Sequence, residues 1–228
     1  MDEASRPFEG VEPVPIEDSI WTDVAKRAVD LVLAAILVLI LSPVLLVIAI
    51  AVAVATPGPV LFRQERLGRD QVRFVMLKFR TMREGSDDEI HREFVTSMFE
   101  TNGEDPGDRG ELHKLTDDPR VTGIGRILRR LSLDELPQLF NVLAGHMSMV
   151  GPRPALPWEA GLFRAHHLIR FDVKPGLTGL WQVSGRSTLT MPQALDLDAE
   201  YVARRSIGLD LWILLRTVPV VLTGRGAS

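Results

Sequence analysis

An uncharged apolar run at residues 31–55 limits what this chain can fold into more than any other feature of the sequence. About 20 apolar residues in a helix are enough to cross the hydrocarbon core of a bilayer, and this run exceeds that length. A secretory signal is the alternative, because Ala53-Val54-Ala55 resembles a cleavage site. The run is too long for the apolar region of a signal, so we predict a membrane segment.

Ser42 and Pro43, near the middle of this run, leave the form of the membrane segment open. Proline removes a helical hydrogen bond and bends the helix axis. Basic residues flank both ends, whereas the positive-inside rule places only one end of a true span in the cytoplasm. The residues alone support a plain span and a hairpin that enters and leaves by the same face about equally. The flanking basic residues are Lys26, Arg27, Arg63, Arg66, Arg69 and Arg73.

Charge is unevenly distributed along the 228 residues, whose net charge is −4. Residues 1–23 contain seven acidic side chains and one arginine, which predicts a disordered acidic tail. The remaining residues include 23 acidic and 25 basic side chains, so the basic excess of a nucleic-acid-binding protein is absent and we expect no nucleic-acid partner. The absence of cysteine excludes disulfides, thiolate metal sites and a cysteine nucleophile.

The five histidines show no metal-ligand spacing. His166 and His167 are adjacent, and we expect their rings to point apart on a helix. The sequence therefore predicts histidines that lie on the surface or make local hydrogen bonds.

The pattern after the membrane segment predicts an α+β fold that is mainly helical and includes one β-hairpin. In the second strand, alternation places Lys78 and Arg80 on one face, where they suit either a phosphate clamp or a solvated face. The glycine-dense stretch 174–186 is not expected to be regular helix, and Arg186 at its end is a candidate anion ligand. The last apolar helix suits either the core or a membrane interface. The expected elements are strands 60–66 and 72–81, a helix 86–99, a mobile acidic loop 101–110, and helices 196–205 and 209–222.

The stretch 131–154 combines adjacent carboxylates with basic residues on both sides. Ser132 and Glu135 have capping-box spacing, which predicts a helix N-terminus here, and Pro137 also allows a later cap at Asp134 itself. In either case the helix dipole is expected to keep Asp134 and Glu135 ionised. An ionised carboxylate is a potential nucleophile or a magnesium ligand, although acidic residues in a first turn are also ordinary capping residues. The nearby cations that suit a phosphate are Arg126, Arg129, Arg130 and Arg153.

Taken together, these motifs resemble those of the bacterial monotopic phosphoglycosyl transferases, also called bacterial sugar transferases. The resemblance covers residues 26–227. It rests on Lys26-Arg27, Ser42-Pro43, residues 62–66 with Gly68, residues 78–82, residues 132–136, residues 151–154 and residues 175–186.

The resemblance implies a monotopic protein in three parts. These are a disordered acidic tail (1–23), a re-entrant membrane helix broken at Ser42 and Pro43 (24–56), and a cytoplasmic phosphoglycosyl transferase domain (57–228). It places the protein at the bacterial inner membrane with the catalytic domain on the cytoplasmic face. The single apolar segment resembles the compact members of the family, and association into a homo-oligomer is left open.

The resemblance also implies a two-step reaction between a UDP-sugar and polyprenyl (undecaprenyl) phosphate. Asp134 would attack the sugar-linked phosphorus and release UMP, and polyprenyl phosphate would then take the sugar phosphate from Asp134. Glu135 would be a catalytic residue that holds Mg²⁺. The residues that would bind phosphate oxygens or nucleotide are Lys78, Arg80, Arg129, Arg153 and Arg186.

The sequence does not identify the sugar, although residues 180–184 resemble members that transfer hexose-1-phosphate. Two other readings remain at this stage. The first is a membrane-bound phosphohydrolase in which water accepts the phosphoryl group. The second is an inactive membrane scaffold that retains the fold.

Overall fold

The computed structural model describes residues 20–83, 92, 96, 99, 120–185 and 189–223. The acidic tail up to residue 19, the predicted loop 101–110 and Arg186 lie outside these residues. Of the predicted helix 86–99, only residues 92, 96 and 99 are described, and all three are helical.

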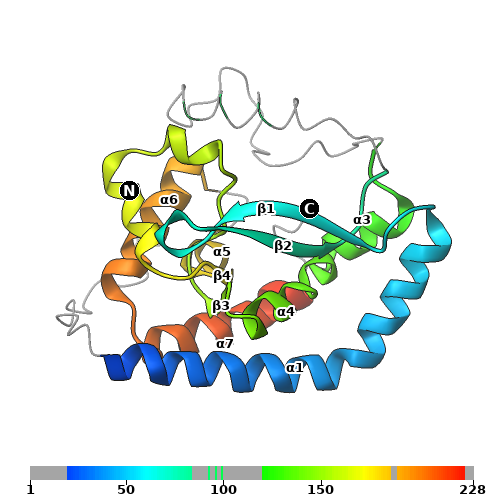
Figure 1. Ribbon diagram of the computed structural model, residues 1–228, viewed down its shortest axis with the longest axis horizontal. Coiled ribbons are helices and arrows are strands. Elements are labelled where there is room, and N and C mark those ends of the chain that lie inside the picture. Colours follow the sequence, from blue (N-terminus) through cyan, green and yellow to red (C-terminus); the bar gives the residue numbers. More distant parts are fainter. Residues whose placement is uncertain are drawn as a thin grey trace.

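The predicted membrane segment is a single long helix, α1 (Ile20–Ala55), which remains helical through Ser42 and Pro43. It is long and apolar enough to cross a membrane over Asp23–Ala55. The first and last parts of α1 run in different directions (Figure 1), as expected for a helix with an internal proline. Ser42 Oγ donates a hydrogen bond to the Leu39 carbonyl at 2.8 Å, a local bond that often accompanies helix bending.

The predicted hairpin is confirmed. Strands β1 (Leu61–Leu67) and β2 (Arg73–Phe79) pair antiparallel, with Phe62 opposite Lys78. A short 3₁₀ turn, η2 (Arg69–Gln71), joins them, and Asp70 there has a φ of 55°. The hairpin lies across the domain on the side opposite the first part of α1 (Figure 1).

The other regular elements of the described chain are helices, apart from two short strands that pair in parallel, β3 (Ser148–Val150) and β4 (Gly176–Thr178). The predicted helices near residues 196–205 and 209–222 are confirmed as α6 (Met191–Arg204) and α7 (Ile207–Thr223). The remaining elements are α3 (Gly123–Arg130), η3 (Leu133–Glu135), α4 (Gln138–Leu143), η4 (Glu159–Leu162), η5 (Ala165–Asp172) and α5 (Leu180–Ser184).

Two local predictions were wrong. Ser132 precedes only the three-residue 3₁₀ helix η3, which contains both carboxylates: its φ of 54° is left-handed, its side chain makes no capping bond, and α4 begins later, after Pro137. The glycine-dense stretch contains the five-residue helix α5, because its glycines lie before and after Leu180–Ser184 and not within it.

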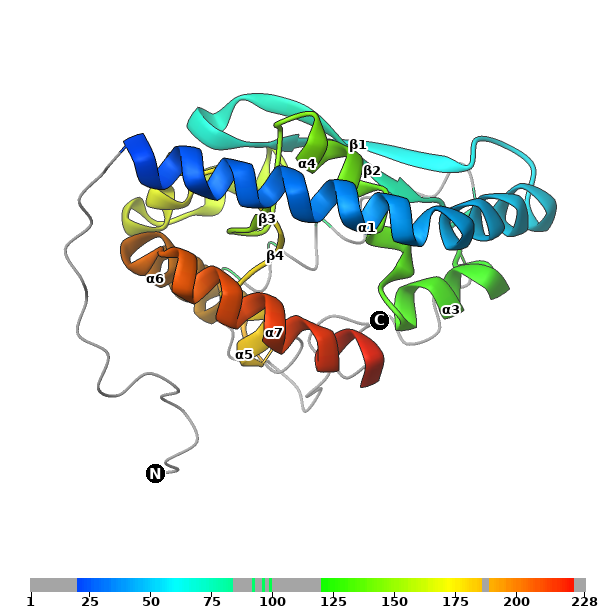
Figure 2. The ribbon, with the colours of Figure 1, turned by 90° about the horizontal axis from the view of Figure 1, so that it is seen from below.

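Both halves of α1 pack against the domain. Ala34 belongs to the main core, together with Leu139, Met147 and Ile213. The later half contributes Ile48 and Val52 to a second cluster with Phe79 and Leu128. The outward side chains of α1 stay exposed, including Leu39, Leu46 and Val54. In Figure 2, α7 lies beside α1 at this side of the domain, and it exposes Leu211, Leu215 and Val218.

Candidate active site

The structure brings Lys78 of β2 against the adjacent carboxylates of η3. Lys78 Nζ lies 2.9 Å from Glu135 Oε1, and both side chains are about a quarter to a third exposed (25% and 31%). Asp134, the preceding residue, is buried. A lysine 57 positions earlier in the chain is thereby paired with the acidic motif.

Asn141 of α4 holds β2 and η3 in this relative position. Its side-chain oxygen accepts from the Leu77 amide at 3.0 Å, and its side-chain nitrogen donates to the Val75 carbonyl at 2.7 Å. These two bonds pair backbone groups on either side of Met76, at the edge of β2 that faces away from β1. Because α4 follows η3 directly, they also fix Lys78 relative to Glu135.

The electrostatics of Asp134 differ from our prediction that a helix dipole favours ionisation. Burial raises the pKa of Asp134 to about 6, although the charges of Lys78 and Arg129 act to lower it. The adjacent Glu135 carboxylate raises this pKa further. Asp134 is therefore mostly ionised at neutral pH, but as a desolvated carboxylate next to a second negative charge.

A polar pocket opens next to this pair. Lys78, Glu135 and Arg153 line it, so the structure brings together three of the residues that the sequence indicated as site residues. Arg153 follows β3 in the Gly151-Pro152-Arg153-Pro154 turn, and its Nη1 lies 3.5 Å from Oε1 of the buried Glu159. Arg129 is in the last turn of α3, and its charge acts on Asp134.

Arg80 has a different environment from Lys78. Its guanidinium donates to the Thr56 and Pro57 carbonyls at 2.7 and 2.8 Å, and to Thr56 Oγ1 at 2.9 Å. Arg80 is buried there. It therefore binds the chain that leaves the C-terminal end of α1, and it is not among the residues that line the pocket. Arg186 lies outside the described residues.

Four polar residues of the pocket were not predicted from the sequence as site residues: Arg66, Gln138, Trp181 and Gln182. Arg66 is buried and donates to the Pro154 carbonyl at 3.0 Å. Trp181 and Gln182 belong to α5, which begins two residues after β4. Because β4 pairs with β3, the start of α5 lies near the Arg153 turn that follows β3. The motif that contains them was visible in the sequence, but its position relative to Lys78 was not.

The adjacent carboxylates fit a divalent cation. Mg²⁺ prefers oxygen ligands, and in phosphate-transfer sites one or two carboxylates usually hold it together with substrate phosphates. Glu135 lines the pocket and Asp134 is the buried residue before it, so the site offers carboxylate oxygens from both. Burial is the main cause of the raised pKa of Asp134, the adjacent Glu135 carboxylate adds to it, and a bound cation would favour the ionised form of both side chains. The donor set therefore suits Mg²⁺.

A second group of titratable side chains joins η5 to α6. The prediction that the two histidine rings point apart was wrong: the Nε2 atoms of His166 and His167 lie 3.1 and 2.9 Å from the same oxygen of Asp196. Both rings turn toward α6 because Asp196 is the shared acceptor. The Arg164 amide donates to His167 Nδ1 at 3.4 Å, which assigns the ring proton to Nε2. Local hydrogen bonds thus link these three side chains, whose ligand atoms lie within 4.8 Å of one another and could also hold a metal ion.

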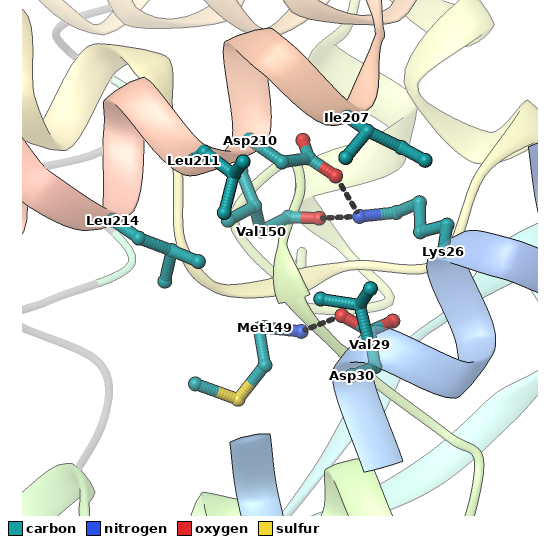
Figure 3. A pocket seen from close by; sticks show the side chains of 9 residues that line it. All are labelled: Lys26, Val29, Asp30, Met149, Val150, Ile207, Asp210, Leu211 and Leu214. Carbon is teal, nitrogen blue, oxygen red and sulfur yellow. Dashed lines mark hydrogen bonds and ion pairs between the residues drawn. The ribbon is translucent and has the colours of Figure 1, made fainter. Parts of the chain in front are cut away.

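Polar side chains fasten the first turns of α1 to the domain (Figure 3). Lys26 Nζ lies 2.6 Å from Asp210 Oδ2 of α7 and donates to the Val150 carbonyl at 3.1 Å. Asp30 accepts from the Met149 amide at 3.0 Å. Arg27 donates to the carbonyls that end α4, at Val142 and Leu143. The apolar helix α1 is therefore bound to β3, the strand that leads to Arg153.

The fold and pocket define a domain with a long apolar helix that is compatible with a membrane anchor and with adjacent carboxylates near a lysine and arginines, a site suited to phosphate chemistry. The chain belongs to the bacterial sugar transferase family, whose model matches residues 21–224.

Named relatives support this assignment. The chain is 40% identical to the exopolysaccharide production protein ExoY of Rhizobium meliloti (strain 1021) over 203 aligned residues. The alignment covers 89% of this chain and 88% of that protein. It is 40% identical over 220 residues to the UDP-glucose:undecaprenyl-phosphate glucose-1-phosphate transferase of Escherichia coli (strain K12), covering 92% of this chain and 43% of that protein. The chain is 38% identical to the undecaprenyl-phosphate galactose phosphotransferase of Salmonella typhimurium over 205 aligned residues. This alignment covers 89% of this chain and 41% of that protein.

Proposed function

We propose that this protein transfers a sugar-1-phosphate from a UDP-sugar to undecaprenyl phosphate and thereby initiates polysaccharide synthesis. The observation that carries the proposal is the contact of Lys78 with Glu135 beside the buried Asp134, at a pocket that also contains Arg153. Family membership and the names of the glucose and galactose transferases support hexose-1-phosphate as the transferred group.

In the first step, an oxygen of the Asp134 carboxylate attacks the phosphorus that carries the sugar. The new bond joins Asp134 to that phosphorus, the diphosphate P–O bond breaks, and UMP leaves with the bonding electrons. In the second step, a phosphate oxygen of the polyprenyl phosphate attacks the same phosphorus and the bond to Asp134 breaks. The Asp134 carboxylate is regenerated, and the product is a polyprenyl diphosphate sugar.

The surrounding cations make this attack feasible. A carboxylate and a diphosphate repel each other, so fixed positive charge must stabilise the transition state. Lys78 and Arg153 line the pocket and bind the phosphate oxygens, and Arg129 adds positive charge at Asp134. Mg²⁺, when bound by Glu135 with Asp134 nearby, supplies further charge neutralisation to the diphosphate. Lys78 orients the Glu135 carboxylate throughout.

A re-entrant α1 is the topology that the contacts at its two ends support. Lys26 and Arg27, near its start, bind Asp210 and Val142 of the domain. Arg80 of the same domain binds Thr56 and Pro57, just beyond its end. A straight span would carry one of these ends across the bilayer. Both ends then lie on the same side of the membrane as the domain. The family resemblance implies that this side is the cytoplasmic face of the inner membrane, where Asp134 would meet the phosphate of its lipid acceptor.

The proposal is tested by following a UDP-sugar that is radiolabelled in the sugar. With purified protein and undecaprenyl phosphate, we expect UMP release and transfer of label to the lipid extract from UDP-glucose or UDP-galactose. Free sugar phosphate that forms without the lipid would instead indicate a hydrolase, and no turnover of any UDP-sugar would indicate a scaffold.

The intermediate is tested at Asp134. Mass spectrometry of protein quenched with donor alone should find a hexose-phosphate adduct on the peptide that contains Asp134. Asp134→Asn should reduce UMP release to below about a thousandth of the original rate, because the amide is not a nucleophile. The control is Asp70→Asn in the exposed hairpin turn, where Asn tolerates the positive φ and turnover should be unchanged. An adduct on another residue would refute the role of Asp134.

A further inference from the structure

Two buried polar atoms of α5 lack hydrogen-bond partners within the described part of the chain: Trp181 Nε1 and Gln182 Oε1. Buried donors and acceptors are rarely left unpaired in folded proteins, because each loses its hydrogen bonds to water without replacement. Both residues line the pocket that contains Lys78, Glu135 and Arg153. These two atoms are thus a donor and an acceptor available to a ligand of that pocket.

The backbone around α5 fixes which atom of Gln182 is available. Gln182 Nε2 faces the Leu177 carbonyl at 3.5 Å, which assigns Oε1 to the other side of the amide. A Cβ at Gly179 would overlap the Gly151 carbonyl and lie 3.0 Å from Gln182 Oε1. The bare glycine therefore lets the start of α5 approach Gly151, in the turn that carries Arg153, and leaves room for Gln182 Oε1.

We propose that Trp181 and Gln182 recognise an uncharged polar group of the nucleotide-sugar donor. Trp181 Nε1 donates to an acceptor on the ligand, and Gln182 Oε1 accepts from an N–H or O–H of the ligand. Charge determines which part of the donor each side chain suits. The cations Lys78 and Arg153 suit the diphosphate, whereas the indole of Trp181 and the amide of Gln182 suit a neutral group. This inference rests on the proposed transfer reaction.

Two parts of a UDP-sugar have the required chemistry. The uracil ring presents carbonyl acceptors beside an N–H donor, and each sugar hydroxyl is both a donor and an acceptor. UMP contains the first part without the sugar, so its affinity distinguishes the two sources.

The test compares Gln182→Met and Trp181→Phe with the original protein. Each variant removes one polar atom and keeps most of the side-chain volume. We expect the KM for the UDP-sugar to rise about tenfold or more in each, while the KM for undecaprenyl phosphate stays unchanged. Equal weakening of UMP binding, measured by titration calorimetry, assigns the contacts to the nucleoside, and unchanged UMP binding assigns them to the sugar.

Ser184→Ala is the matched control. Ser184 Oγ, in the same helix, is also buried without a partner among the described residues, but Ser184 does not line the pocket, so the donor KM of this variant should stay unchanged. An unchanged donor KM in both Gln182→Met and Trp181→Phe, in protein that turns over normally, would overturn this inference and leave the transfer reaction intact. Loss of affinity for donor and acceptor alike would indicate a structural role and would also overturn it. Failure of the original protein to release UMP would reject the transfer reaction, and this inference with it.

Discussion

At the scale of single residues, the charge of Lys78 is the simplest part of the site to test. Lys78→Met removes the cation that faces Glu135 at 2.9 Å and leaves two adjacent carboxylates against an incoming diphosphate. We expect kcat/KM for UMP release to fall about 100- to 1,000-fold, the usual effect of removing one group that stabilises transition-state charge. Lys78→Arg, which keeps the charge, should recover part of the loss. Equal activity of the Met variant would exclude Lys78 from the site.

Glu159 is expected to act on the reaction indirectly by holding Arg153. Its carboxylate is buried, accepts from the Leu156 amide at 2.8 Å and lies 3.5 Å from Arg153 Nη1. Glu159→Gln should raise the donor KM several-fold with a smaller change in kcat, because Arg153 loses the charge that orients it. The matched control is Glu65→Gln, since Glu65 pairs with Arg73 on the exposed face of the hairpin and its loss should change neither constant.

The pH dependence of stability offers an independent test of Glu159. Burial alone would raise its pKa, but the charges of Arg153 and Arg66 and the Leu156 amide hold the pKa below the ordinary 4.5. A lowered pKa in the folded state stabilises the protein above pH 4.5, and this contribution is lost as the pH falls below that value. In urea unfolding, Glu159→Gln should therefore differ most from the original protein at neutral pH and least near pH 3. A constant difference would contradict the ionised state of Glu159.

Sequence reasoning identified the carboxylates and basic residues but could not assign their contacts. Alternation along the predicted strand 72–81 treats Lys78 and Arg80 alike, yet Lys78 faces Glu135, whereas Arg80 lies just beyond β2 and binds the chain that follows α1. The difference depends on where η3 and the end of α1 pack, which local pattern does not encode. Trp181 and Gln182 were likewise visible in a motif without any signal of which charged residues they adjoin.

At the scale of elements, the contact between α1 and α7 is open to a stability test. Lys26 Nζ lies 2.6 Å from Asp210 Oδ2, and the two side chains are 22% and 11% exposed. Asp210→Asn should lower the free energy of unfolding by about 1–3 kcal/mol, less than a fully buried pair because of the partial exposure. The effect should appear as a lower melting temperature in detergent. Additive effects in Lys26→Met, Asp210→Asn and the double variant would show that the pair does not interact.

The accuracy of the element predictions followed their length and regularity. The long apolar helix, the hairpin and the two C-terminal helices have strong local patterns, and all are present. Strands β3 and β4 have three residues each and pair in parallel across a connection of about 25 residues, so no local signal marks them. Ser132 was misjudged because a capping-box spacing does not reveal that its backbone is left-handed.

At the scale of the whole molecule, α1 and α7 both expose large apolar side chains, including Leu39 of α1 and Leu215 of α7. The two helices lie on the same side of the domain, the side seen in Figure 2. An exposed apolar surface of this kind suits a lipid environment and not water. Because both ends of α1 are bonded to the domain, insertion of the bend into one leaflet leaves those bonds intact.

The absence of native cysteine makes this topology directly measurable in single-cysteine variants. Asp23→Cys and Gln71→Cys lie on opposite sides of the apolar segment, and both positions are exposed. If α1 is re-entrant, an impermeant maleimide should label neither in intact cells and both after permeabilisation. Pro43→Leu in each background restores the missing helical hydrogen bond and favours a straight span, so it should expose one of the two positions to the outside. Labelling of either site in intact cells that keep Pro43 would refute the hairpin, since the bonds of Lys26 and Arg80 to one domain could not then both form in the membrane.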